Sequence, residues 1–140
     1  MKRRKPLKRS KIKKTLKPIS ILKKRLDYVS RELVKIRDNH TCQRCGKKVW
    51  GTNCHASHVI PCSAGNKLRW DLMNMKVLCW YDHFHFWHLN PTDSGEWFKN
   101  KFPDRWAYLE ANKGMVQMKH LDFQELLDKL EAELKIKQNE

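Results

Sequence analysis

The sequence predicts a small α+β domain built around one modest hydrophobic core. The chain has 140 residues, of which 40% are hydrophobic, so it holds enough apolar material for one core but not for two. A helical pattern covers residues 22–38, short extended segments follow at 53–61 and 75–80, and helical patterns return after residue 90. Strands that are grouped between runs of helix favour the α+β class.

The first helix and the turn after it have clear local signals. Leu26, Val29 and Leu33 recur at three- and four-residue steps, which predicts a helix with one apolar face. Asp38-Asn39 ends that pattern, and a tight turn over residues 42–46 follows. Gly46 suits this turn because glycine accepts positive φ without steric cost. Farther along, residues 83–88 predict a short helix.

Three further helices are predicted in the last third of the chain. Ser94 is a candidate N-cap for a helix over 95–101, and Pro103 fits the first turn of a helix over 103–112. Residues 121–138 carry an apolar stripe that predicts either a core face or a dimer contact. Five tryptophans are expected to fill the core of a domain with few aliphatic residues: Trp70, Trp80, Trp87, Trp97 and Trp106.

The positive charge of the chain is concentrated in its first segment. Formal net charge is +15, and residues 1–25 contain 13 Lys or Arg and no acidic residue. Such a segment predicts either a nucleic-acid-binding arm, because each cation can displace a counterion from a phosphate, or a solvated tail. We favour the arm, since like charges at this density repel one another without a polyanionic partner. The residues expected to contact DNA there are Lys2, Arg3, Arg4, Lys5, Lys8 and Arg9.

The remaining bulk features indicate a soluble chain in a reducing compartment. No stretch approaches the length of apolar residues that spans a membrane, and Met1 to Lys17 never becomes hydrophobic as a secretory leader would. A cytoplasmic location is therefore expected. The five cysteines are an odd number, which favours metal ligation over a disulfide framework.

Two cysteines have the spacing of a zinc knuckle. Cys42 and Cys45 are separated by two residues, and a turn of this length brings both sulfurs to one metal ion. Cys79 is the expected third ligand of a structural Zn²⁺. The fourth is either Asp82 or His83, because zinc accepts carboxylate oxygen and imidazole nitrogen alike.

In content, order and spacing, four segments together resemble the HNH endonucleases. These segments are Arg37-Asp38-x2-Thr41-Cys42-x2-Cys45-Gly46, Ser57-His58-Val59-Ile60-Pro61, Asn74, and Leu78-Cys79-x3-His83. The stretch from residue 50 to 102 is similar to phage recombination endonucleases of the lambda Rap (NinG) group. The resemblance covers roughly residues 31–106.

The resemblance implies a fold and a set of roles. It implies a zinc-stapled ββα-metal domain with flanking helices and the basic N-terminal arm. His58 would be the general base that takes a proton from water, Asn74 would bind the catalytic metal or orient the base, and His83 would bind that metal. A neutral imidazole can accept a proton at physiological pH, and a divalent cation such as Mg²⁺ or Mn²⁺ can neutralise charge in the transition state.

Two positions depart from the family pattern. The residue before the base is usually Asp or His, yet here it is Ser57, so His55 or a water molecule would take its place at the metal. The second knuckle reads Cys79-x2-Asp82-His83, where the family commonly has Cys-x2-Cys-His. Asp82 as fourth zinc ligand would keep His83 free for the catalytic metal, and this is the arrangement we favour.

Other polar residues near the motif have two interpretations each. His88 would contact metal or phosphate, or would be a polar edge on an aromatic helix, because a four-residue step from His83 reaches Trp87 and not His88. Lys67 and Arg69 would hold the DNA backbone, or would be solvated loop charges. Cys54 and Cys62 are expected to be ordinary buried or half-buried thiols.

The sequence thus predicts three segments and a metal-dependent DNA nuclease. The segments are a flexible basic arm over 1–25, an HNH nuclease domain with its zinc knuckle over 26–112, and a C-terminal amphipathic helix over 113–140. DNA is the expected partner, with branched or recombination-intermediate DNA implied by the Rap-like group, and a homodimer could form through the 121–138 stripe. The alternative is a catalytically inactive zinc module that binds nucleic acid, which Ser57 and Asp82 motivate.

Overall fold

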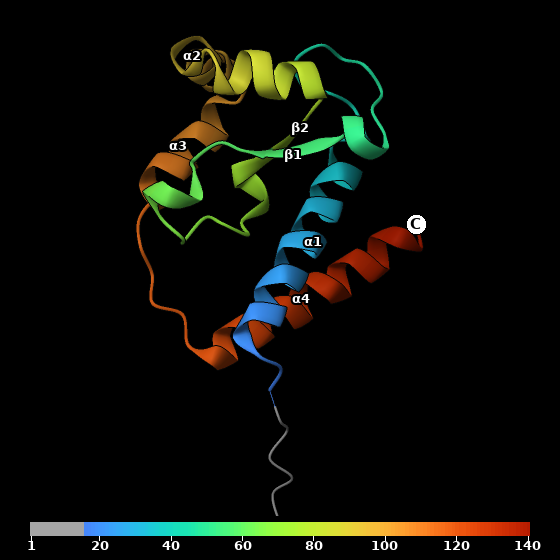
Figure 1. The fold of residues 1–140 in the computed structure, drawn as a ribbon, viewed down its shortest axis with the longest axis vertical. Coiled ribbons are helices and arrows are strands. Elements are labelled where there is room, and N and C mark those ends of the chain that lie inside the picture. Colours follow the sequence, from blue (N-terminus) through green and yellow to red (C-terminus); the bar gives the residue numbers. More distant parts are fainter. Residues whose placement is uncertain (1–15) are drawn as a thin grey trace, which may run out of the picture.

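The computed structural model describes residues 16–140 and confirms the α+β class (Figure 1). A two-stranded sheet lies between α2 and α3 at one end and the α1–α4 pair at the other. The main elements are α1 (Ile19–Arg37), β1 (His55–His58), β2 (Met75–Leu78), the π-helical segment Asp82–His88, α2 (Pro91–Lys101), α3 (Pro103–Asn112) and α4 (His120–Gln138).

The sheet is a short antiparallel hairpin that carries site residues on both strands. His55 pairs with Leu78, Ser57 with Lys76, and His58 with Met75. Both strands are shorter than the extended segments predicted from the sequence. All four residues of β2 are buried, because α1 packs against one side of the strand and aromatic side chains cover the other. The hairpin is therefore held firmly between the two helical parts.

Helices α1 and α4 pack against each other and form the first part of the core. Leu22, Leu26, Val29 and Leu33 on α1 are buried in one cluster with Trp70 and with four residues of α4. The α4 residues are Phe123, Leu127, Leu130 and Leu134. The apolar stripe of α4 is thus a core face, while Leu121 and Ile136 remain exposed.

The predicted boundary between arm and domain falls inside α1. Ile19 to Arg25 form the first turns of this helix, and Leu22 is fully buried against α4. Residues 1–15, which include the six predicted DNA contacts of the arm, lie outside the described residues. None of the helices described in residues 16–140 has the length and apolar character needed to cross a membrane.

Helices α2 and α3 cover the other side of the hairpin with aromatic side chains. The predicted helix over 103–112 is confirmed. By contrast, α2 begins at Pro91 instead of after Ser94, because Pro91 takes the first-turn position. Ser94 lies inside the helix, and its hydroxyl donates to the carbonyl of Trp87 at 3.2 Å.

The tryptophans do not all belong to the core. Trp70 is buried, and Trp87, Trp97 and Trp106 are half-buried against the clusters around α2 and the sheet. Trp80 contradicts the sequence prediction, since half of it is exposed to solvent. It lies two residues after the end of β2, just before the π-helical segment, and its ring contacts those of Phe84 and His85 outside the core clusters.

Replacing Leu22 by alanine tests whether the start of α1 belongs to the folded body. Because Leu22 is fully buried, Leu22→Ala should lower the free energy of unfolding by about 2–5 kcal/mol. Ile21→Ala is the matched control, since Ile21 is 51% exposed and its loss should change stability by about 0.5 kcal/mol or less. Urea denaturation measures both, and equal effects would contradict the assignment of residues 19–25 to the core.

Candidate metal and nuclease site

Three cysteines and one aspartate form a compact ligand cluster. Cys42 and Cys45 lie on the turn after α1, Cys79 follows β2, and Asp82 begins the π-helical segment. One ligand atom from each residue lies within 4.8 Å of the other three. The turn takes the shape predicted for a knuckle, with Gly46 at φ 76°. Three sulfurs and one carboxylate oxygen at this spacing can hold a metal ion.

Asp82, and not His83, completes this cluster. The Oδ2 atom of Asp82 lies 3.2 Å from the Sγ of Cys42 and 3.4 Å from that of Cys79. Its Oδ1 accepts a 2.6 Å hydrogen bond from Arg44, whose guanidinium stacks 3.6 Å from the centroid of the Phe86 ring. Arg44 therefore orients the carboxylate from outside the cluster, a common role for the partner of a metal ligand.

The electrostatics of the cluster suit a bound cation. Burial, together with the nearby Cys42 and Asp82, raises the pKa of the Cys79 thiol to about 12. Burial also raises the pKa of Cys42. Burial acts to raise the pKa of Asp82 too, but hydrogen bonds from Arg44 and the thiols hold it below its usual value. A divalent cation offsets the cost of placing thiolates beside a carboxylate, because metal binding releases the thiol protons.

A second cluster consists of three histidines, which we call the histidine cluster: His55, His83 and His88. The Nε2 atoms of His83 and His88 are 3.0 Å apart, and the rings of His55 and His83 have centroids 4.9 Å apart. Sequence spacing argued against His88 as a partner of His83 because an α-helix repeats every 3.6 residues. The segment Asp82–His88 is π-helical, and its wider turn brings residues five apart onto one face.

His83 has the properties of a metal ligand. Its Nδ1 atom is buried and has no hydrogen-bond partner in the structure. Burial, with the positive fields of His88, His55 and Lys76, lowers the pKa of His83 to about 4, so the imidazole is neutral at physiological pH. A neutral imidazole with a free nitrogen can coordinate a divalent metal ion. On β1, the Nε2 of His55 lies 2.9 Å from the carbonyl of Thr52, which leaves its Nδ1 as the nitrogen for a ligand.

His58 lines a cavity together with His83 and His88, two members of the histidine cluster. The cavity has a volume of about 610 Å³, and its lining includes His58, His83, His88 and Arg31. The Nε2 of His58 lies 2.9 Å from the carbonyl oxygen of Arg69. Because a carbonyl only accepts, Nε2 carries the proton and Nδ1 keeps its lone pair. Burial lowers the pKa of His58 below 6.5, which keeps this base neutral.

Asn74 braces the loop that follows His58. It is fully buried, its Oδ1 accepts from the backbone N–H of Ile60 at 2.7 Å, and its Nδ2 donates to the carbonyls of Ile60 and Leu68. These bonds occupy the amide. The geometry therefore fits the role of orienting the base more closely than that of a metal ligand.

Lys76 is a site residue that sequence reasoning missed. Its side chain is fully buried on β2, and its Nζ donates to the Oγ of Ser57 at 3.2 Å and to the carbonyl of His58 at 3.4 Å. The Nζ also lies 3.2 Å from the centroid of the Trp87 ring. Burial lowers the pKa of Lys76 well below its ordinary value, while the ring and the two oxygens stabilise the ammonium form. Ser57, where the family pattern has Asp or His, is thus bonded to a buried amine.

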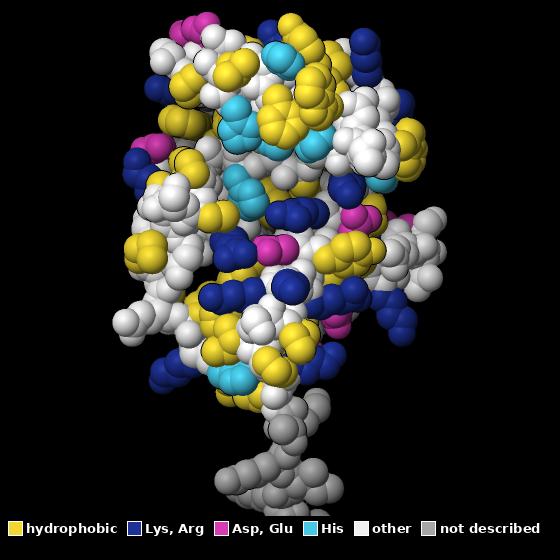
Figure 2. Space-filling view, viewed as in Figure 1, with side chains coloured by type: hydrophobic (Ala, Val, Ile, Leu, Met, Phe, Trp, Pro, Cys, Tyr) yellow, Lys and Arg dark blue, Asp and Glu magenta, His cyan; other side chains and the backbone are white. Residues whose placement is uncertain are grey.

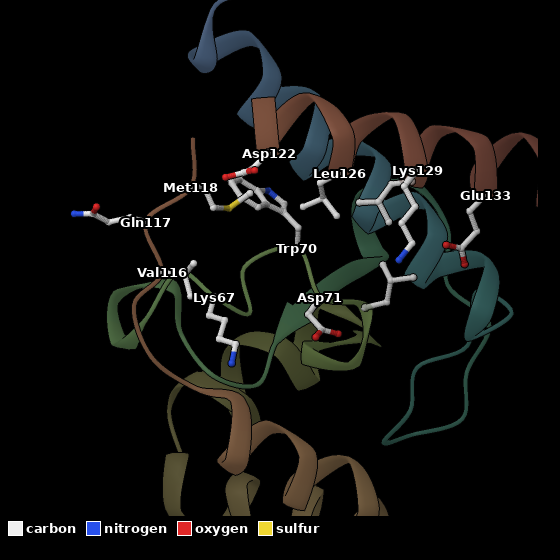
Figure 3. A pocket seen from close by; sticks show the side chains of 12 residues that line it. Lys67, Trp70, Asp71, Val116, Gln117, Met118, Asp122, Leu126, Lys129 and Glu133 are labelled. Atoms are coloured by element: carbon white, nitrogen blue, oxygen red, sulfur yellow. The ribbon is translucent and has the colours of Figure 1, made fainter. Parts of the chain in front are cut away.

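The two loop cations predicted to contact DNA have other partners. The guanidinium of Arg69 binds Asp27 of α1 through two hydrogen bonds of 3.2 and 2.9 Å, which ties the loop to the helix. Lys67 lines a different cavity of about 600 Å³, between α4, the segment before it and the loop at Trp70 (Figure 3). Arg31 is the cation beside His58 instead. The sequence signal for it was its place on α1 one turn after Asp27, on the polar side of a helix that was interpreted only for its apolar face.

Cys54 is a buried thiol as predicted, whereas the prediction for Cys62 is wrong, because its side chain is exposed on the loop after β1. Neither cysteine belongs to the cluster with Asp82. Arg31 takes part in none of the ion pairs found among residues 16–140. Its charge is therefore available to a ligand in the cavity that His58 lines.

Comparison with known protein families agrees with this geometry. Residues 42–85 match the family model described as HNH endonuclease. The matched range begins at the first cysteine of the knuckle and contains His58, Asn74 and His83. No curated protein and no solved structure gives a significant match. The HNH domain indicates a nuclease that depends on a metal ion.

Exchanging single cysteines tests the first cluster. Cys45 is an exposed member, so Cys45→Ser should leave the core intact while removing one sulfur ligand. We expect zinc content after dialysis against a chelator to fall from one equivalent towards zero, and the thermal transition to drop, because metal binding contributes to folding. Cys62→Ser, also an exposed cysteine, should keep full zinc content and stability. Loss of zinc in both variants, or in neither, would contradict the assigned cluster.

Proposed function

We propose that this protein is an HNH endonuclease that hydrolyses phosphodiester bonds of DNA. The observation that carries the proposal is the shared cavity, which is lined by a neutral, carbonyl-oriented His58 and by the pair His83 and His88. A base and candidate metal ligands that line one cavity are what hydrolysis of a phosphate diester requires.

In this proposal the chain supplies the base, its orientation and the ligands. His58 accepts a proton from a water molecule at Nδ1, while its Nε2–H stays bonded to the carbonyl of Arg69. The hydroxide attacks the phosphorus, the bond to the 3′ oxygen breaks, and the leaving oxygen takes a proton from solvent, so the products are a 5′-phosphate and a 3′-hydroxyl. Asn74 holds the loop after the base in position during this step.

Two metal ions have separate roles in the proposal. Cys42, Cys45, Cys79 and Asp82 would hold a structural Zn²⁺. His83 and His88, with His55 as a third ligand, would hold the catalytic Mg²⁺ or Mn²⁺. When bound, this second cation supplies neutralisation of the charge that develops on the phosphate and on the leaving oxygen.

The DNA strand would approach over α1. Figure 2 shows Lys and Arg side chains gathered over this helix, below the histidines at the upper end of the same face. Arg31 lines the cavity itself and would contact a phosphate next to the one that is cut. The contact of the basic residues 2–9 with DNA, predicted from the sequence, also belongs to the proposal. In its most specific form, the proposal names branched or recombination-intermediate DNA of a phage as the substrate.

The alternative of an inactive zinc module is motivated by Ser57, whose hydroxyl is engaged by Lys76. The buried, neutral imidazole of His83, in contact with the rings of His55 and His88, argues for activity, because binding to DNA alone would not require an uncharged imidazole there. The two functions differ in one measurement, cleavage in the presence of added metal.

Removal of the base tests the proposed chemistry. His58→Ala should lower the rate of plasmid nicking in Mg²⁺ or Mn²⁺ by about 100- to 10,000-fold, the usual contribution of a general base. Zinc content and DNA affinity should stay unchanged, since His58 belongs to neither binding function. Cys62→Ser, which alters an exposed residue of the same cavity lining, is the matched control and should remain active.

The pH profile of the wild-type protein adds a second check on the same residue. Because burial lowers the pKa of His58, the neutral form persists below pH 6.5, and the nicking rate should fall only at still lower pH. An unchanged rate in His58→Ala would remove this residue from the mechanism. DNA binding without cleavage in any metal would favour the inactive module.

A further inference from the structure

Beside the histidine cluster lies a group of exposed rings that the hydrolysis does not use. Trp80, Tyr81 and Phe84 are 50%, 61% and 41% exposed, and we call them the aromatic platform. None of the three hydrophobic clusters described within residues 16–140 includes any of them. Figure 2 shows hydrophobic side chains gathered with histidines at this end of the molecule. Exposed aromatic groups of this kind usually mark a binding surface.

The platform is held in place by contacts among the rings. The ring centroids of Trp80 and Phe84 are 5.7 Å apart. The His85 ring contacts two of the platform rings: its centroid lies 5.2 Å from that of Trp80, and it stacks on Tyr81 at 4.8 Å. The backbone N–H of Trp80 donates to the side chain of Asn53 at 2.8 Å. Because these rings are already ordered, a ligand that stacks on them loses little affinity to ordering them.

The platform is also continuous with the proposed catalytic site. The Phe84 ring lies 4.8 Å from the ring of His83 and 5.6 Å from that of His55, measured between centroids. All of the platform residues flank Asp82 and His83 in sequence, so both ligand clusters fix their backbone. A nucleotide next to a phosphate bound at the histidine cluster would therefore pass over the platform.

The local charge favours a polyanionic strand over an acidic protein surface or a hydrophobic partner. Residues 39–70 contain no Asp or Glu. The one acidic residue of the segment 72–90, Asp82, is buried and paired with Arg44. The segment that carries the rings therefore contains no unpaired carboxylate that would repel phosphates.

We propose that the aromatic platform stacks unpaired nucleobases, so that this site binds and cuts DNA next to single-stranded nucleotides. In a duplex, the faces of the bases stack on their neighbours and only base edges reach the grooves, whereas unpaired bases offer a free face to aromatic side chains. The preference for cutting rests on the proposed function, while the binding itself does not. The ligand class is an unpaired stretch of DNA strand.

Binding without added divalent metal separates this inference from the catalytic proposal. The probes are a labelled single-stranded oligothymidylate, a hairpin duplex of equal charge, and a strand of the same length built from abasic nucleotides. Fluorescence anisotropy of the full-length, zinc-bound protein should give tighter binding to the oligothymidylate than to the abasic strand. Trp80→Leu should weaken oligothymidylate binding by about 5- to 100-fold, the effect of losing one stacked base. Binding to the duplex and to the abasic strand should change less than about twofold.

Conservative and distant variants complete the test. Trp80→Phe keeps a ring and should restore most of the affinity, whereas leucine keeps only apolar bulk. Tyr108→Leu removes an exposed ring from α3 and should have no effect. Zinc content is measured for each variant, since Trp80 lies between Cys79 and Asp82 in sequence.

Three outcomes would overturn the inference. They are equal affinity for the oligothymidylate and the abasic strand, equal binding by Trp80→Leu and the wild type, or a change in self-association as the only effect of Trp80→Leu. Stacking that depends on Trp80 in a protein that cuts no DNA would support the inference and reject the proposed function. Cleavage whose rate depends neither on unpaired bases nor on Trp80 would support the proposed function and reject the inference.

Discussion

The contact between the Asp82 carboxylate and the thiols of Cys42 and Cys79 joins the turn after α1, the end of β2 and the start of the π-helical segment. The same parts also share the hydrophobic cluster around Val34, Val49 and Val77, and the backbone N–H of Gln43 donates to the carbonyl of Val77 at 2.9 Å. With Asp82 fixed at this point, the next residue, His83, lies on another side of the wide turn. The π-helical geometry then brings His88 to it. The geometry of the histidine cluster therefore depends on the position of Asp82, which belongs to the cysteine–aspartate cluster.

A second constraint is the burial of polar groups around His58. Asn74 is fully bonded to backbone atoms, and Lys76 binds Ser57 and the carbonyl of His58 beneath the Trp87 ring. Buried amides and amines stabilise a fold only when their hydrogen bonds are made, so each of them admits few arrangements of the loop. The rigidity of the base is thus supported by groups that cannot move without leaving a buried polar atom unbonded. Burial of a polar amide and an amine costs free energy of folding, and such local costs are common at functional sites.

The sequence predicted the main elements and the residues that gather in the cysteine–aspartate cluster, for reasons that can be traced to particular residues, whereas the ligands expected for the catalytic metal (Asn74, His83 and His55) stay a prediction. Leucine spacing identified α1 and α4, Pro103 identified the start of α3, and the cysteine pair with Gly46 identified the knuckle. It failed where a position depends on tertiary geometry. The π-helical turn at His83 has no propensity signature, so the pairing with His88 was not expected, and Lys76 in a short strand gave no sign of burial. Arg69 was assigned to DNA because its partner Asp27 lies 42 residues away.

The central claim is that consecutive residues, Asp82 and His83, belong to two different metal sites. Zinc content of His83→Gln, measured after dialysis against a chelator, tests this claim most directly. If Asp82 completes the cysteine cluster, His83→Gln retains one tightly bound zinc per chain, as the wild type does, although it no longer cleaves DNA when Mg²⁺ or Mn²⁺ is added. Loss of the tightly bound zinc from His83→Gln would mean that His83 is its fourth ligand, and the proposed division between the two sites would be wrong.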